Sequence, residues 1–132
     1  MKKILFLVGF ALLLGLTVLY ARGKNEKITG IYSSMFYHEE AGDVLGVEAF
    51  IVFTKRGYYV LLQQSEGEPE IPVLVPLKVD NKQISFTLPD TIMGYTGIFN
   101  GEIKNDRLIG YFHTNNENRK KIELKRKSSY WQ

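Results

Sequence analysis

The chain has 132 residues, no cysteine and a formal net charge of +3. This length supports one domain, and the lack of cysteine excludes a disulfide framework, a thiolate zinc site and a cysteine nucleophile. Lys2, Lys3 and Arg22 lie near the N-terminus before any acid, and the remaining 14 lysines and arginines equal the 14 acids in number. This balance argues against a nucleic-acid partner in spite of the basic pI.

The first 23 residues predict a signal peptide or an N-terminal membrane anchor. Lys2 and Lys3 precede an uncharged run over residues 4–21, and Ala21 and Gly23 are small residues where signal peptidase reads the chain. As a helix at about 1.5 Å per residue, this run approaches the ~30 Å hydrocarbon thickness of a bilayer. We therefore expect an exported protein, periplasmic or secreted if the leader is cleaved, and associated with the membrane through residues 4–21 if it is not.

Residues 24–132 predict a single all-β domain. Apolar side chains recur there with a period of two in short runs rich in aromatic and β-branched residues, and Ile84, Phe86 and Leu88 are a clear example. The predicted strands span residues 28–37, 47–54, 58–64, 71–79, 83–88, 97–103, 107–113 and 119–126. Pro72 and Pro76 indicate that the fourth strand is an edge strand or an irregular one. We expect a small antiparallel up-and-down barrel of about eight strands.

Short and long connections alternate between these strands. The short ones, at 55–57, 80–82 and 104–106, are rich in residues typical of tight hairpin turns. The longer ones span 38–46, 65–70, 89–96 and 114–118. In simple up-and-down order, all long connections would lie at one end of the barrel and all tight turns at the other.

These two ends are expected to carry opposite charge. The long connections contain eight acids and neither lysine nor arginine: Glu39, Glu40, Asp43, Glu66, Glu68, Glu70, Asp90 and Glu117. The tight turns with the adjoining Arg107 carry Lys55, Arg56, Lys82, Lys104 and Arg107 against Asp80 and Asp106. The first strand starts at the tight-turn end, so an uncleaved leader would hold the basic end against anionic headgroups and direct the acidic end outward.

Two short segments resemble the calycins, the group of small β-barrels that includes lipocalins and avidins. They are Gly30-Ile31-Tyr32 on the first strand and Leu124-Lys125-Arg126 on the last. In calycins a Gly-x-Trp motif on the first strand packs near a basic residue of the last strand, and here Tyr32 stands at the tryptophan position. The resemblance implies a barrel that holds a small apolar ligand.

The interior of an eight-stranded barrel can also be filled by side chains alone. We expect aromatic residues to fill it: Phe36, Phe53, Tyr58, Phe86, Phe99 and Phe112.

The sequence contains few candidates for site chemistry. His38, Glu39, Glu40 and Asp43 form the densest group of potential calcium ligands, but a solvated acidic loop is the favoured interpretation. No serine occupies a nucleophile elbow, and neither histidine has a recognisable catalytic partner. The basic stretch at 119–127 is interpreted as an outward strand face that blocks edge pairing, with binding of anionic lipid or polysaccharide as the alternative. No metal, cofactor or catalytic residue is assigned.

The pattern favours a non-enzymatic exported binding module whose acidic end engages a basic or cationic partner, either a protein or a small molecule. The predicted binding residues are Glu40, Asp43, Tyr58, Gln64, Glu66 and Glu68. A calycin-like carrier of a small apolar molecule is the main alternative. A hydrolase that uses two carboxylates at this end, such as Glu40 and Glu66, is a further one.

Overall fold

The computed structural model describes residues 27–89, 97–113 and 119–127. In these residues the chain forms nine strands: β1 (Gly30–Ser33), β2 (Phe36–His38), β3 (Asp43–Thr54), β4 (Gly57–Gly67), β5 (Val73–Asp80), β6 (Gln83–Thr87), β7 (Ile98–Lys104), β8 (Arg107–His113) and β9 (Arg119–Arg126). The predicted leader, with its anchor helix, lies outside the described residues. Within the described part of the chain, no helix has the length and apolar character needed to cross a membrane.

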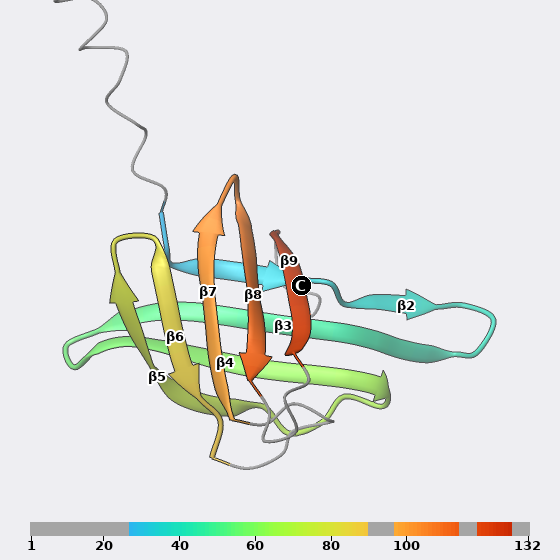
Figure 1. Cartoon of the computed structure of the whole chain (residues 1–132). Helices are drawn as coiled ribbons and strands as arrows, with labels where there is room; N and C mark the ends of the chain where they lie inside the picture. Colours follow the sequence, from blue (N-terminus) through green and yellow to red (C-terminus); the bar gives the residue numbers. More distant parts are fainter. Residues whose placement is uncertain (1–26, 90–96, 114–118, 128–132) are drawn as a thin grey trace, which may run out of the picture.

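Eight of these strands close into an antiparallel barrel (Figure 1). From β3 to β9 each strand pairs with its neighbour in sequence, and β1 closes the barrel by pairing with both β3 and β9. β2 continues from β1 along β3, and β3 is its only partner among the described strands. The predicted all-β up-and-down barrel is confirmed.

The first predicted strand is broken in two between Ser33 and Phe36. Side chains replace the regular ladder there: Ser33 Oγ accepts a hydrogen bond from the Met35 amide at 3.1 Å, and Ser34 Oγ accepts one from Val47 N at 3.1 Å. Such local bonds from serine side chains compete with strand pairing. The break separates β1, which belongs to the barrel, from β2, which does not.

The strands β3 and β4 are longer than predicted. Their pairing continues without interruption from Thr54↔Gly57 to Val44↔Gly67, so β3 begins at Asp43 and β4 ends at Gly67. The expected long connection over residues 38–46 is therefore only a four-residue turn, residues 39–42. The ends of β3 and β4 project with β2 beyond the barrel as a three-stranded extension (Figure 1).

The three tight turns occur where the sequence predicts them, between β3 and β4, β5 and β6, and β7 and β8. In the β7–β8 turn both Asn105 (φ 52°) and Asp106 (φ 56°) have left-handed backbone conformations. Two consecutive positive φ angles are the requirement of a type I′ hairpin turn, and asparagine and aspartate adopt them more readily than most residues.

Buried side chains fill the interior between the described strands. The rings of Phe86, Phe99 and Phe112 pack together with centroid distances of 4.8, 5.2 and 5.8 Å. Phe99 also lies over the cross-strand pair Gly101↔Gly110, where an added Cβ would overlap its ring. These three rings confirm half of the predicted aromatic core, and the half-buried Tyr58 packs against it.

The prediction is wrong for Phe36 and Phe53, which are 50% and 66% exposed. Phe36 lies on β2 outside the barrel, and Phe53 lies beside the β3–β4 turn, where it contacts the half-buried Tyr58 at a ring distance of 4.7 Å. Both residues are on the inward-facing register, but the barrel wall does not extend far enough to cover them.

Arg126 joins the last strand to the first at the tight-turn end of the barrel. Its guanidinium carbon lies 4.7 Å from the ring centroid of the fully buried Tyr32. It donates hydrogen bonds to Tyr32 Oη at 2.5 Å, to the Thr29 carbonyl at 2.7 Å and to Asp106 Oδ1 at 2.9 Å. The contact expected between the Gly30-x-Tyr32 segment and a basic residue of the last strand is thus present.

Candidate functional site

The acidic residues gather on the three-stranded extension, which we call the acidic flap and define as residues 36–45 and 64–70. The flap is built by the pairs His38↔Asp43, Leu45↔Glu66 and Val44↔Gly67. Long regular pairing between β3 and β4 therefore brings the turn at 39–42 and the end of β4 into one structure.

The carboxylates of the flap differ in exposure. Glu39 and Glu40 are exposed in the β2–β3 turn, Asp43 is half-buried at the start of β3, and Glu66 is exposed on β4. Asp43 lies beside Gly67, where an added Cβ would be 3.8 Å from Asp43 Oδ1. Asp43 and Glu66 are thus strand residues, although the sequence placed them in loops, and the pairing holds their backbones in fixed register.

The connection between β4 and β5 folds back along β4. The Glu70 amide donates to the Gln64 carbonyl at 3.0 Å, and Gln63 Nε2 donates to the Glu70 carbonyl at 2.9 Å. A further bridge joins Ser65 to Pro69. These contacts place the exposed Glu68 and Glu70 next to the end of β4, on the same side of the molecule as Glu66.

Gln64 carries an unpartnered acceptor inside this end of the barrel. Its side chain is 4% exposed, and Nε2 donates to Glu66 Oε1 at 3.0 Å. Its Oε1 is buried and has no hydrogen-bond partner within the described part of the chain. Buried polar atoms are nearly always paired, so this acceptor is an exception within the packed end of the barrel, and its burial keeps it out of reach of a partner at the surface.

Exposed aromatic rings accompany the acids, and the sequence prediction missed them as site residues. Phe36 is 50% and Tyr37 53% exposed on β2, and Phe36 lies 6.5 Å from the ring of His38. The sequence signal for this surface is the run of three successive aromatic rings, Phe36, Tyr37 and His38, on a strand that leaves the barrel. The rings of Phe36 and Tyr37 are exposed because the break between Ser33 and Phe36 separates β2 from the barrel.

Tyr58 does not belong to this group. It lies near the start of β4, beside the β3–β4 turn, whereas Gln64 and Glu66 lie near the other end of the same strand. At about 3.3 Å per residue, Tyr58 and Gln64 are roughly 20 Å apart along β4. The structure thus brings together Glu40, Asp43, Gln64, Glu66 and Glu68 of the predicted set and excludes Tyr58.

In the described residues, acidic and basic side chains lie at opposite ends of the strands, as the alternation of long and short connections in the sequence predicted. Six of the eight predicted acids lie in the flap, and Asp90 and Glu117 lie outside the described residues. The tight turns at the opposite ends of the strands carry Lys55, Arg56, Lys82 and Lys104.

The histidine of the flap has a structural role. His38 Nδ1 accepts a hydrogen bond from the Ala41 amide at 3.3 Å, which supports the β2–β3 turn. Among residues 27–89, 97–113 and 119–127, no group of three or more histidine and acidic side chains is arranged to hold a metal ion.

β9 pairs with β8 along its length but with β1 only at Lys125 and Arg126, so no described strand pairs with the other edge of residues 119–124, and the interpretation of its basic residues as a block to edge pairing stays a prediction. Part of this charge is neutralised locally. Glu123 forms ion pairs with Arg107 and Lys121, and the hydrogen bond from Arg107, followed by that from Lys121, lowers the pKa of Glu123 below its ordinary value. Arg126 is engaged at the barrel closure.

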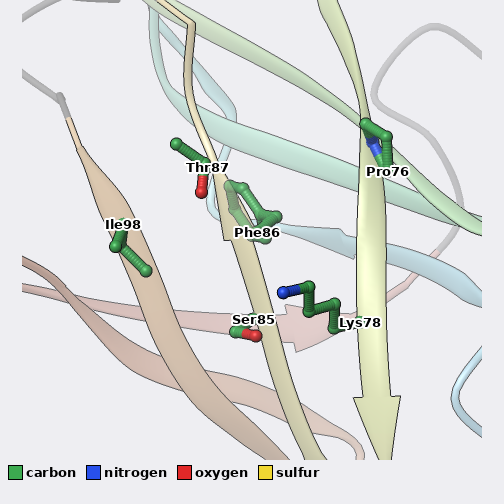
Figure 2. A pocket seen from close by; sticks show the side chains of 6 residues that line it. All are labelled: Pro76, Lys78, Ser85, Phe86, Thr87 and Ile98. Atoms are coloured by element: carbon green, nitrogen blue, oxygen red, sulfur yellow. The ribbon is translucent and has the colours of Figure 1, made fainter.

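A hollow away from the flap, which we call the side groove, opens between β5 and β6 (Figure 2). It has a volume of about 280 Å³ and is lined by Pro76, Lys78, Ser85, Phe86, Thr87 and Ile98. The pairing of β5 with β6 ends at Lys78↔Ser85. In antiparallel pairs the hydrogen-bonded positions alternate, so the next one would need an N–H from Pro76, which proline lacks.

No protein-family model matches the chain, and neither does a curated protein or a solved structure.

Proposed function

We propose that this protein is an exported, non-enzymatic binding module whose acidic flap engages a basic or cationic partner. The observation that carries the proposal is the segregation of charge. Glu39, Glu40, Asp43, Glu66, Glu68 and Glu70 lie within residues 39–70, and the sequence has no lysine or arginine at 28–54 or 57–77. Acids in segments that contain no lysine or arginine attract a positively charged partner and disfavour a negatively charged one.

The flap also offers contacts that are not simply electrostatic. Phe36 and Tyr37 provide exposed rings, and such rings over which a lysine or arginine can lie add a cation–π attraction. Lysine and arginine side chains suit both the acids and these rings, so the proposed partner is a basic segment of another protein.

The test is calorimetric titration of the full chain with an oligolysine peptide, with oligoglutamate as the charge-reversed control. We expect binding of oligolysine only, and at least tenfold weaker binding when the salt rises from about 0.1 M to about 1 M, because the screening length falls from ~10 Å to ~3 Å. Replacing Glu39, Glu40 and Glu66 by glutamine should weaken binding by a similar factor. Glu102→Gln, on β7 outside the flap, is the matched control. Salt-independent binding, or equal binding by both variants, would contradict the proposal.

A calycin-like carrier is the second candidate, and the contact of Tyr32 with Arg126 is the observation that favours it. The burial of Phe86, Phe99 and Phe112 in the interior favours the binding module instead, because these rings occupy space that a ligand would need. Titration with a fluorescent fatty acid separates the two. A carrier binds it saturably at one site, and Phe112→Ala, which enlarges the interior, should strengthen that binding.

A further inference from the structure

The outer face of one side of the barrel is apolar. Residues that face outward on β1, β3, β4 and β5 form two cross-strand rows, Ile31–Phe50–Leu61–Leu74 and Val52–Tyr59–Pro76. The alternate residues on these strands, such as Ile51, Val60 and Val75, are buried in the core, so the rows point away from it. Phe50 is 40% and Leu74 59% exposed. We call these seven residues the apolar wall.

The opposite side of the barrel carries more charge. The outward positions Lys121, Glu123 and Lys125 of β9 alternate with the buried Ile122 and Leu124, and the outward positions of β8 include Arg107 as well as Ile109 and Tyr111. A barrel whose whole outer surface faces water is expected to carry charged and polar side chains on every side. An apolar patch that spans four neighbouring strands is typical of an interaction surface.

Positive charge borders the apolar wall at the tight-turn end. Lys78 follows Pro76 on the same outward face of β5, and Lys55 and Arg56 form the β3–β4 turn. Beside this turn, Phe53 is 66% exposed and contacts Tyr58. Aromatic and apolar side chains next to lysine and arginine are the combination that favours the interface of an anionic membrane.

The side groove adjoins the same border. Figure 2 shows the ammonium group of Lys78 reaching from β5 toward β6, with the ring of Phe86 between the two strands. The groove thus combines an apolar lining from Pro76, Phe86 and Ile98 with one cation and the hydroxyl groups of Ser85 and Thr87. A phospholipid offers the complementary groups, because its phosphate suits the ammonium and hydroxyl groups and its chain suits the apolar lining.

We propose that the apolar wall, with the β3–β4 turn and the side groove at its edge, docks on the surface of an anionic phospholipid bilayer. Eight residues separate the uncharged run over residues 4–21 from β1, and Gly30 of β1 pairs with Ile51 toward the tight-turn end of β3. Whenever that run is retained in a membrane, this end of the barrel is kept at the lipid surface. The acidic flap lies at the opposite ends of β3 and β4, so this docking is independent of the proposed function and leaves the flap accessible.

The lack of cysteine in the chain permits a site-specific test. An environment-sensitive fluorophore is attached to the full chain at Leu74→Cys on the apolar wall or, as the matched control, at Tyr111→Cys, which is 42% exposed on β8. Each labelled protein is mixed with vesicles of equal parts phosphatidylglycerol and phosphatidylcholine. We expect a blue shift and quenching by lipid-borne quenchers at position 74 only. Because the readout is local, insertion of residues 4–21 by itself does not produce it.

Three results would overturn the proposal. Equal responses at positions 74 and 111 would mean that the apolar wall has no preferred contact with lipid. A shielded label at position 74 without vesicles, together with a dimer in sedimentation, would assign the wall to a second copy of the chain. A response unchanged on vesicles of phosphatidylcholine alone would remove the role of charge.

The contribution of the cations is measured with paired variants. Each lysine or arginine near an anionic surface contributes roughly a fivefold gain in affinity, so we expect Lys55→Gln with Arg56→Gln to lower the apparent affinity reported by the label at position 74 about 25-fold. Lys104→Gln, in the β7–β8 hairpin away from the wall, should leave it unchanged. Equal effects of the two changes would also count against the proposed orientation.

Discussion

Gly110 illustrates how one residue without a side chain permits the aromatic core. Phe99 lies over Gly110 and its cross-strand partner Gly101, and a Cβ at position 110 would overlap the ring and the backbone of β7. We expect Gly110→Ala to lower the free energy of unfolding by about 1–3 kcal/mol, because overpacking forces side chains and backbone to shift. Urea denaturation measures this. Adding Phe99→Leu should recover part of the loss, and strict additivity of the two changes would contradict the contact.

Arg126 depends on the geometry of the guanidinium group as well as its charge. It stacks on Tyr32 and donates in several directions at once, including to Thr29 O and Asp106 Oδ1. Lysine keeps the charge but cannot reproduce these contacts, so Arg126→Lys should lower the free energy of unfolding by about 2 kcal/mol. The control Lys125→Arg, on the exposed face of β9, should change it little. Equal stability of the two variants in urea would contradict this role.

Glu123 provides a test of the electrostatics on β9. Hydrogen bonds from Arg107 first and Lys121 second lower the pKa of its carboxyl group. A folded-state pKa below the unfolded value means that the ion pairs stabilise the fold above the unfolded pKa, and this contribution is lost as the pH falls through the folded pKa. Carboxyl ¹³C titration by NMR should place the pKa of Glu123 below that of an ordinary glutamate. Arg107→Gln should raise the pKa of Glu123 more than Lys121→Gln does, because the hydrogen bond from Arg107 is the larger cause of the lowered pKa.

At the scale of strands, Pro76 determines where β5 and β6 separate. Pro76 pairs with Tyr59 of β4, and its nitrogen lies on the edge of β5 that faces β6. We expect Pro76→Val to supply the missing donor, extend the pairing toward Thr87 and narrow the side groove. Hydrogen exchange should then show a protected amide at position 76. Pro72→Val, which precedes β5, is the control, and a rapidly exchanging amide at position 76 would show that the separation has another cause.

The acidic flap is also a property of strands. Strand periodicity identified β3 and β4, but the predicted β3 began only after Gly46, and the predicted β4 ended in the polar run at Gln64. Gly46 and Ser65 nevertheless pair with each other, and pairing continues to Val44↔Gly67. Backbone hydrogen bonds do not require apolar side chains, so pairing can run past the point where the hydrophobic pattern ends.

At the scale of the whole molecule, the β1–β9 seam is the short joint in the closed barrel. It has the pairs Tyr32↔Arg126 and Ser33↔Lys125 plus the bond from Lys127 N to Ile31 O, whereas β3 and β4 pair along their whole lengths. We expect amides at this seam to exchange through partial opening, at lower free energy than the central amides of β3 and β4. Native-state hydrogen exchange measures both. Identical opening free energies would indicate that the barrel opens only by global unfolding.

The sequence by itself determined the class of fold and the order of the strands. Alternation of apolar and polar residues, as in Ile84 to Leu88, is a local consequence of the two-residue period of a strand. Tight-turn residues such as Asn105 and Asp106 force antiparallel neighbours, so the up-and-down order and the separation of acidic from basic ends also followed from local chemistry.

Only the tertiary structure decided which residues share a surface. Whether Phe36 and Phe53 are core or exposed depends on how far the barrel wall extends past them, and this is a property of the neighbouring strands. Tyr58 and Gln64 are close in sequence but lie near opposite ends of β4. The apolar wall likewise depends on register, because Ile31, Phe50, Leu61 and Leu74 come from four separate strands and meet only when those strands pair.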